Sequence, residues 1–328
     1  MLGYIIRRLC GAAALFFALT FATYTIFFVL PLRRTPGTRL LVENLNQRPL
    51  ALSGSVIQQY GQFLGHVFGG SMGRSVVTHE DVTTIVANAA PVTISLVVGG
   101  AIIWLALAIP IGVFSALRPR SLTDRLATVG MLVGISAHPI WIGYVLSYFF
   151  GYRWHVTPIA GYCNLRGNQI GCAGPVQWAY HLLLPWLTFA LLFGALYMRM
   201  IRASVLEALD QDYVRTARAK GAPELRVLRS HVLRNAFLPI LTMMGMDIGV
   251  AFGGAVFVEA VFGLPGLGGV AVASLRVHDL PVITGIVVWT TLAIVGLNLL
   301  VDLLYAWIDP RIRFDSIEHA GRPATAGA

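Results

Sequence analysis

Long apolar segments alternate with short polar ones along this 328-residue chain. Six of them are long enough to cross a bilayer, and they cover residues 9–30, 91–117, 126–150, 182–198, 237–261 and 282–308. A hydrocarbon core of about 30 Å takes roughly 20 helical residues. Runs of this length fit helices, which satisfy their own backbone hydrogen bonds, better than the alternating strands of a barrel. The pattern predicts an all-α membrane protein with six transmembrane helices.

Composition supports this prediction. Hydrophobic residues make up 56% of the chain and charged residues 12%, and the mean hydropathy is +0.72. A soluble domain usually has about 25% charged residues. The first span follows Arg7 and Arg8 and ends at Leu30 and Pro31 without a small-x-small cleavage site. We therefore expect it to be an uncleaved anchor rather than a signal peptide.

The distribution of basic residues predicts the orientation, because Lys and Arg near span ends are retained in the cytoplasm. Six spans place both termini on one side. That side carries sixteen of the basic residues, namely Arg7, Arg8, Arg118, Arg120, Arg125, Arg199, Arg202, Arg215, Arg218, Lys220, Arg226, Arg229, Arg234, Arg311, Arg313 and Arg322. The other side carries eight, so we expect both termini to be cytoplasmic. The net charge of +9 reflects this topology and gives little reason to expect nucleic-acid binding.

One charged segment, residues 199–236, separates the fourth and fifth spans. Residues 210–220 are good helix formers, with acidic side chains near the start and basic ones near the end, and Gly221 and Pro223 follow them. This arrangement suits the helix dipole and predicts a short helix along the membrane face. Such a helix is suited to docking a soluble partner. The alternative is a solvated basic loop held near anionic lipid.

Residues 211–221 resemble the cytoplasmic loop of binding-protein-dependent ABC importer permeases, specifically the oligopeptide/dipeptide branch. Arg215, Thr216 and Ala217, with Gly221 after them, stand where the wider superfamily has Glu-Ala-Ala and a later Gly. Further matches follow in order and extend the resemblance over about residues 70–313; they are residues 124–126, 181–185, 254–259, 262–268 and 302–313.

The resemblance implies a type I ABC importer permease fold in the bacterial cytoplasmic (inner) membrane. Residues 1–90 would hold the first helix and an external segment, residues 91–313 the permease domain, and residues 314–328 a cytoplasmic tail. The chain would form half of the translocation pathway for dipeptides or oligopeptides. Alternative cargoes in the same importer class are haem, glutathione and nickel complexes. An ion-coupled secondary transporter is a remote alternative, because we find neither its inverted repeat nor more intramembrane charge.

The power source is expected on other chains. The sequence contains no Gly-x-x-x-x-Gly-Lys-[Ser/Thr] phosphate loop, so we expect no enzyme activity and no cofactor here, with ATP and Mg on partner ATPase subunits. The implied partners are a second, homologous permease, two ATP-binding subunits or one fused ATPase chain, an external substrate-binding lipoprotein, and membrane lipid. By resemblance, coupling to the ATPase falls to Asp212, Tyr213, Arg215, Thr216, Ala217, Arg218, Lys220 and Gly221.

Two carboxylates are candidates for the translocation pathway. Asp247 lies near the middle of the fifth span, where a charged group is costly and by default faces a cavity or a partner. It either contacts a peptide amino group or is protonated or hydrogen-bonded within the bundle. Glu259 lies near the outer end of the same span. We expect Asp302, in the sixth span, to be structural.

Two further features lie in the expected outer loops. Cys163 and Cys172 share one loop, where an oxidising exterior favours a disulfide. A metal site is the rival interpretation, although no His or acidic residue lies between them, and we expect Cys10 to stay unpaired. The Gly-rich loop at residues 262–281 fits either a re-entrant hairpin or an ordinary surface loop.

Overall fold

The computed structural model describes residues 2–29, 55–165, 172 and 174–308. This part of the chain is helical throughout, apart from short connections and one isolated bridge between Arg74 and Asp81. The all-α prediction is therefore confirmed. The N-terminal stretch of the external segment, residues 30–54, and the expected tail at 314–328 lie outside the described residues.

Within the described residues, five helical segments are long and apolar enough to cross a membrane. They are built on α1 (Leu2–Tyr24, continued by the π-helical turn η1, Thr25–Val29), α5 (Val82–Leu117), α8 (Gly174–Leu209), α11 (Arg234–Phe262) and α13 (Leu280–Ile308). A sixth crossing would consist of α6 (Leu122–Ser136) together with α7 (Pro139–Leu146) and the turn η3 (Ser147–Arg153).

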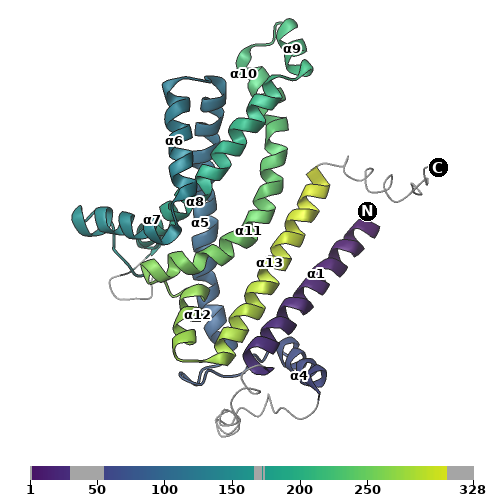
Figure 1. Cartoon of the computed structure of the whole chain (residues 1–328), viewed down its shortest axis with the longest axis vertical. Helices are drawn as coiled ribbons and strands as arrows, with labels where there is room; N and C mark the ends of the chain where they lie inside the picture. The colour runs from purple at the N-terminus through teal and green to yellow at the C-terminus, as the bar shows by residue number, and fades with distance from the viewer. Residues whose placement is uncertain (1, 30–54, 166–171, 173, 309–328) are drawn as a thin grey trace, which may run out of the picture.

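The expected third span is bent. The axes of α6 and of the α7–η3 segment differ by 110°. The break falls at Ala137 and His138, directly before Pro139, which begins α7 and has no backbone N–H to continue the hydrogen bonding of α6. In Figure 1, α7 accordingly leaves the bundle sideways at the foot of α6.

The core forms where α5 and α8 pack along their lengths. Leu96 and Trp104 of α5 are fully buried against Phe189 and Tyr197 of α8. Helices α6 and α11 pack on α8, while α13 packs on both α11 and α1 (Figure 1). A short helix, α4 (Val56–Phe68), lies beside α1, and the Tyr60 hydroxyl is 2.7 Å from that of Thr20.

The two ends of the bundle carry different elements (Figure 1). Beyond one end project α9 (Asp212–Ala219), α10 (Glu224–Val227) and the π-helical turn η4 (Leu228–Leu233), which leads into α11. The opposite end carries α4 and α12 (Leu267–Arg276). Helix α12 packs on α5, α11 and α13, and its Leu267 and Gly268 are buried. The Gly-rich loop therefore contains a packed helix and is more than a surface connection.

Several helices are longer than the spans predicted from hydropathy. Helix α5 begins at Val82 instead of residue 91, and α8 runs from Gly174 to Leu209 instead of over residues 182–198. The domain boundary expected at residue 90 therefore falls inside α5. Hydropathy identifies only the apolar part of a helix, which is suited to the hydrocarbon core. The helix itself can continue beyond this part into more polar sequence.

Candidate functional site

Helix α9 is amphipathic, although it has only eight residues. Val214 and Ala217 are buried and join Val227 and Val232 in the main core. The remaining residues of the expected coupling set are exposed: Asp212, Tyr213, Arg215, Thr216, Arg218, Lys220 and Gly221. The helix is thus fixed to the bundle by one apolar face and presents a polar face to solvent.

The end of α9 depends on Gly221, which has a φ of +77°. The Gly221 N–H donates to the carbonyl of Arg218 at 2.9 Å, and the Ala222 N–H donates to the carbonyl of Ala217 at 3.2 Å. Glycine adopts this left-handed conformation without steric cost and commonly ends helices in this way. The predicted short helix is present, but it covers Asp212–Ala219 instead of residues 210–220, and Gly221 makes the turn that follows it.

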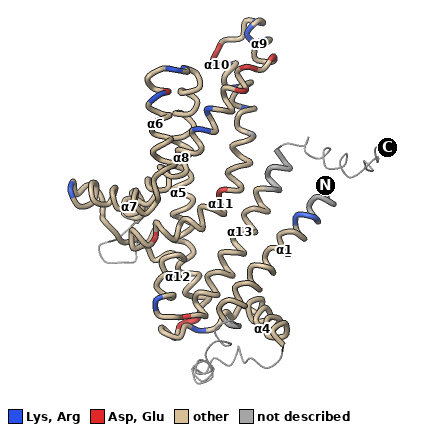
Figure 2. The backbone as a smooth tube through the Cα atoms, viewed as in Figure 1, with Lys and Arg blue, Asp and Glu red and all other residues tan. Residues whose placement is uncertain are grey.

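The charges on α9 are partly engaged within the chain. Arg218 binds Glu224 through two contacts, Nε to Oε1 at 2.9 Å and Nη2 to Oε2 at 3.2 Å. Arg215 makes a looser contact of 3.7 Å with Asp212, and its side chain is 70% exposed. Arg215 is therefore the more available of the two arginines, and Arg218 also links α9 to α10. Figure 2 shows these charges at the projecting end.

A buried ion pair joins α8 to the start of α6. Arg202 donates from Nε to Asp124 Oδ1 at 2.7 Å and from Nη2 to Oδ2 at 3.1 Å. The Ser115 hydroxyl, from α5, donates to the same carboxylate, as does the Arg120 N–H. We name these residues the α5–α6–α8 clamp. Sequence analysis missed it, although the segment 124–126 is part of the family resemblance.

Glu259 is fully buried and serves the start of α12. Its carboxylate accepts from the Thr93 hydroxyl at 2.6 Å and from the Gly269 N–H at 2.9 Å. The Leu267 N–H donates to Thr93 Oγ1 at 2.8 Å. Free N–H groups and the positive end of the helix dipole favour an anion at this position. A pathway role for Glu259 stays a prediction, and in this structure its carboxylate is the cap of α12.

The approach of Glu259 requires a glycine in the preceding turn. A Cβ atom added to Gly266 would lie 2.3 Å from the Glu259 carboxyl group. The glycine at position 266 therefore has a steric explanation, because the buried carboxylate of Glu259 occupies the space that a side chain at this position would need.

Asp247 lies near the middle of α11 and is partly exposed. Its Oδ2 atom is buried and has no hydrogen-bond partner among the described residues. The phenol of the fully buried Tyr197 lies beside the carboxylate.

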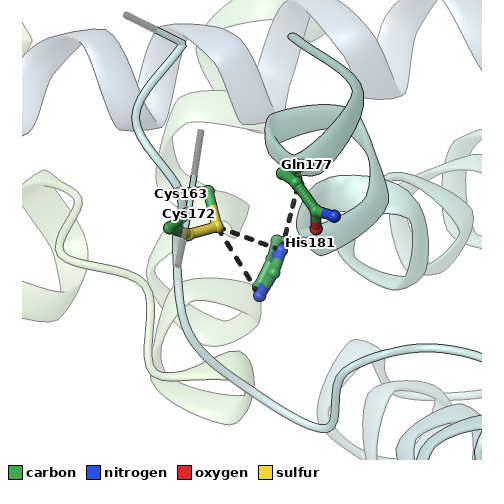
Figure 3. The surroundings of a disulfide bond; sticks show 4 residues. All are labelled: Cys163, Cys172, Gln177 and His181. Atoms are coloured by element: carbon green, nitrogen blue, oxygen red, sulfur yellow. Dashed lines mark hydrogen bonds between the residues drawn. A yellow bond between two sulfur atoms is a disulfide. The ribbon is translucent and has the colours of Figure 1, made fainter. Parts of the chain in front are cut away.

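Cys163 and Cys172 are joined in a disulfide beside the start of α8 (Figure 3). His181 Nδ1 lies 3.3 Å from Cys163 Sγ and 2.9 Å from the carbonyl oxygen of Gln177. The three side chains place their possible ligand atoms within 4.8 Å of one another. Joined sulfurs are not thiolate ligands, so this disulfide state is not a metal site. The sequence analysis missed His181, because it considered only the residues between the two cysteines as further metal ligands. Cys10 is free and exposed.

These features define a helical, multi-span membrane protein with a short, amphipathic surface helix at one end and a buried-carboxylate cap at the other. Residues 108–314 match the family of binding-protein-dependent transport system inner membrane components, and residues 1–97 match the N-terminal region of such components. The chain belongs to this family and is a multi-pass inner membrane protein.

Similar proteins are found in other bacteria. One is the "Probable peptide ABC transporter permease protein y4tP" of Sinorhizobium fredii, 35% identical over 322 residues, which cover 95% of this chain and 99% of that protein. Another is the "Probable D,D-dipeptide transport system permease protein DdpB" of Escherichia coli, 34% identical over 303 residues, which cover 86% and 88%. The similarity thus extends over nearly the whole chain.

Proposed function

We propose that this chain is the permease subunit of a peptide importer and forms half of its translocation pathway. The peptide cargo is supported by the names of its relatives. The α9 end of the bundle faces the cytoplasm in this proposal, in accord with the sixteen basic residues assigned to that side. Its partners are a second, homologous permease, ATP-binding subunits and an external substrate-binding lipoprotein.

The observation that carries the proposal is the construction of α9. Its apolar face is buried in the core through Val214 and Ala217, so a force on its polar face acts on the bundle rather than on a loose loop. Helix α9 follows α8 after only Asp210 and Gln211. A partner that binds α9 is therefore connected to a membrane-crossing helix.

The α5–α6–α8 clamp connects α8, and through it α9, to two further helices of the bundle. Arg202 lies seven residues before the end of α8 and holds Asp124, at the start of α6. A displacement of this part of α8 would pull on the α5–α6 turn as well. We propose that closure of the ATPase subunits moves α9, α8 and the α5–α6 turn together, and that this movement changes which side of the pathway is open.

The chain itself performs no bond chemistry in this proposal. ATP and Mg bind to the partner ATPase, while Arg215 and the other exposed residues of α9 supply complementary charge and shape. Haem, glutathione and nickel complexes are the alternative cargoes. Uptake assays with the cognate binding protein separate them from peptides.

The test is charge reversal on α9. In the Arg215→Glu/Arg218→Glu variant, attractive contacts with acidic groups of the ATPase become repulsive, so we expect loss of ATPase co-purification and of substrate-stimulated hydrolysis. Because Arg218 also holds Glu224, a second variant, Arg218→Glu/Glu224→Arg, preserves an internal ion pair while it changes the presented surface. Arg74→Glu, in an exposed pair with Asp81 outside α9 and α10, is the matched control.

Full co-purification and full coupling in the doubly reversed protein would show that α9 is not the docking element. A single substitution is a weaker test, because an exposed ion pair contributes only about 0.2 to 1 kcal/mol.

A further inference from the structure

Three carboxylates of the spanning helices differ in their partners. Asp124 is bound by Arg202 and Ser115, and Glu259 is bound by Thr93 and the start of α12. Asp247, by contrast, has a buried Oδ2 atom without a hydrogen-bond partner in the described part of the chain. A buried polar atom without a partner is rare in folded proteins, and an ionisable residue at membrane depth indicates function. The Oδ2 atom of Asp247 is therefore available to a donor from outside these contacts.

The apolar parts of α5, α8, α11 and α13 supply no cation to neutralise Asp247. Residues 82–117, 174–198, 235–262 and 280–308 contain neither Lys nor Arg. Arg202 is already bound to Asp124, and Arg199 lies two residues from Tyr197 along α8, which places its side chain on the opposite side of the helix. A cation that pairs with this carboxylate therefore has to come from outside these helices.

On its Tyr197 side, the surroundings of Asp247 are aromatic and buried. Tyr197, beside the carboxylate, and Trp104, whose ring centroid is 5.9 Å from that of Tyr197, are both fully buried. The Tyr197 hydroxyl and Trp104 Nε1 also have no hydrogen-bond partner among residues 2–29, 55–165, 172 and 174–308. The low polarity of this buried side strengthens an ionic contact at Asp247.

Access to Asp247 comes from the surface of α11. Its sequence neighbour Met246 is 70% exposed and Val250, one turn further, is 62% exposed. Gly253 and Phe257 continue this exposed stripe along the helix. A solute that passes along the stripe meets one carboxylate, and the apolar groups on either side offer no competing charge.

We propose that Asp247 binds the primary ammonium group of the cargo during its passage through the membrane, with Tyr197 as a positioning residue. This inference rests on the proposed peptide import, because a peptide carries an α-ammonium group at its N-terminus. A carboxylate pairs with that group at close range, while the buried phenol of Tyr197 restricts the position of the carboxylate. The contact is transient, because the cargo must dissociate from Asp247 to complete its passage.

Cation preference at this site can be measured without knowledge of the cargo. A Cys10→Ser/Val250→Cys variant, assembled with its ATPase and binding protein in vesicles, places one reactive thiol next to Asp247. We expect a cationic methanethiosulfonate ethylammonium reagent to react about tenfold faster than the anionic ethylsulfonate, beyond their intrinsic difference with free cysteine. Adding Asp247→Asn should remove this preference, Asp247→Glu should retain it, and Tyr197→Phe should reduce it.

Uptake by the same complexes links the site to transport. Asp247→Asn should lower the uptake of a radiolabelled dipeptide by about tenfold or more while ATP hydrolysis stimulated by the loaded binding protein is retained. Asn298→Leu is the control, because Asn298 Oδ1 is also buried without a partner in the described residues but carries no charge. Its uptake should match that of the parent protein.

The outcomes separate the two proposals. If the parent complex imports no peptide but its thiol shows the Asp247-dependent cation preference, the peptide assignment is wrong and the cation site is kept. If the parent imports peptide and Asp247→Asn imports it equally well, the site proposal is overturned while peptide import is kept. Equal reagent preference with and without Asp247→Asn also overturns it. Because Asp247→Glu keeps the charge and Tyr197→Phe keeps the ring, they show whether an effect of Asp247→Asn comes from misfolding.

Discussion

Arg202 of α8 holds Asp124 of α6 through two hydrogen bonds, at 2.7 Å and 3.1 Å, in a setting where the aspartate side chain is only 8% exposed. The Ser115 hydroxyl adds a contact from α5, so three helices meet at one carboxylate. A guanidinium matches a carboxylate in this two-point geometry, which a lysine does not reproduce. The pair fixes the relative position of the helices next to α9.

Removal of either Asp124 or Arg202 alone should lower the stability of the folded protein more than removal of both. Asp124→Ala leaves Arg202 as a partly buried, unpaired charge and should destabilise the protein by about 3 kcal/mol, whereas Asp124→Ala/Arg202→Met should restore part of that loss. Thermal unfolding midpoints in detergent, compared with those of the parent, measure both. A double variant that is less stable than Asp124→Ala would show that the pair is not coupled as described.

A side chain at Gly221 should loosen the end of α9. Gly221→Val forces a β-branched residue into a φ of +77°, at a cost of about 1 to 2 kcal/mol. We expect faster amide hydrogen exchange over residues 212–222 and weaker ATPase coupling. Ala219→Val changes an exposed residue inside the same helix and is the control for size. Equal exchange in the two variants would exclude a conformational role for Gly221.

Loss of the Glu259 carboxylate should release the start of α12. Glu259→Ala removes an acceptor that serves Thr93 and Gly269, and unpaired buried donors cost about 1 to 3 kcal/mol each. Amide exchange of residues 267–276 should become faster, and Glu259→Gln, which keeps one acceptor oxygen, should have a smaller effect. If Glu259→Ala leaves α12 protected but abolishes peptide uptake, the pathway role predicted from sequence would replace the capping role.

The disulfide predicts a direct chemical observation. Digestion of unreduced protein should yield one crosslinked peptide pair that contains Cys163 and Cys172, with Cys10 as a free thiol. Reduction should destabilise this region by about 2 to 3 kcal/mol, because the bond closes a short loop with a sequence separation of 9. Cys10→Ser should change neither result. Two free thiols in membranes prepared without reductant would contradict the pairing.

The sequence predicted features that depend on local patterns. Hydropathy located the spanning segments, and charge distribution with Gly221 located α9, because each signal lies within a few turns of one helix. The contacts of the clamp and of Glu259 were not predicted, since their partners are 78 and 166 residues apart in sequence. A single sequence does not show which helices meet. The bend before Pro139 has its local cause in that proline, but its 110° angle depends on packing.

Helix α8 has 36 residues, which corresponds to about 54 Å, almost twice the hydrocarbon thickness of about 30 Å. It begins next to the disulfide and ends two residues before α9, so one continuous helix connects the disulfide-bonded loop to α9. A tilt of about 10° around its midpoint would move each end by roughly 5 Å in opposite directions. In the proposed coupling, α8 moves as one rigid body, so inward motion at one end and outward motion at the other are a single displacement.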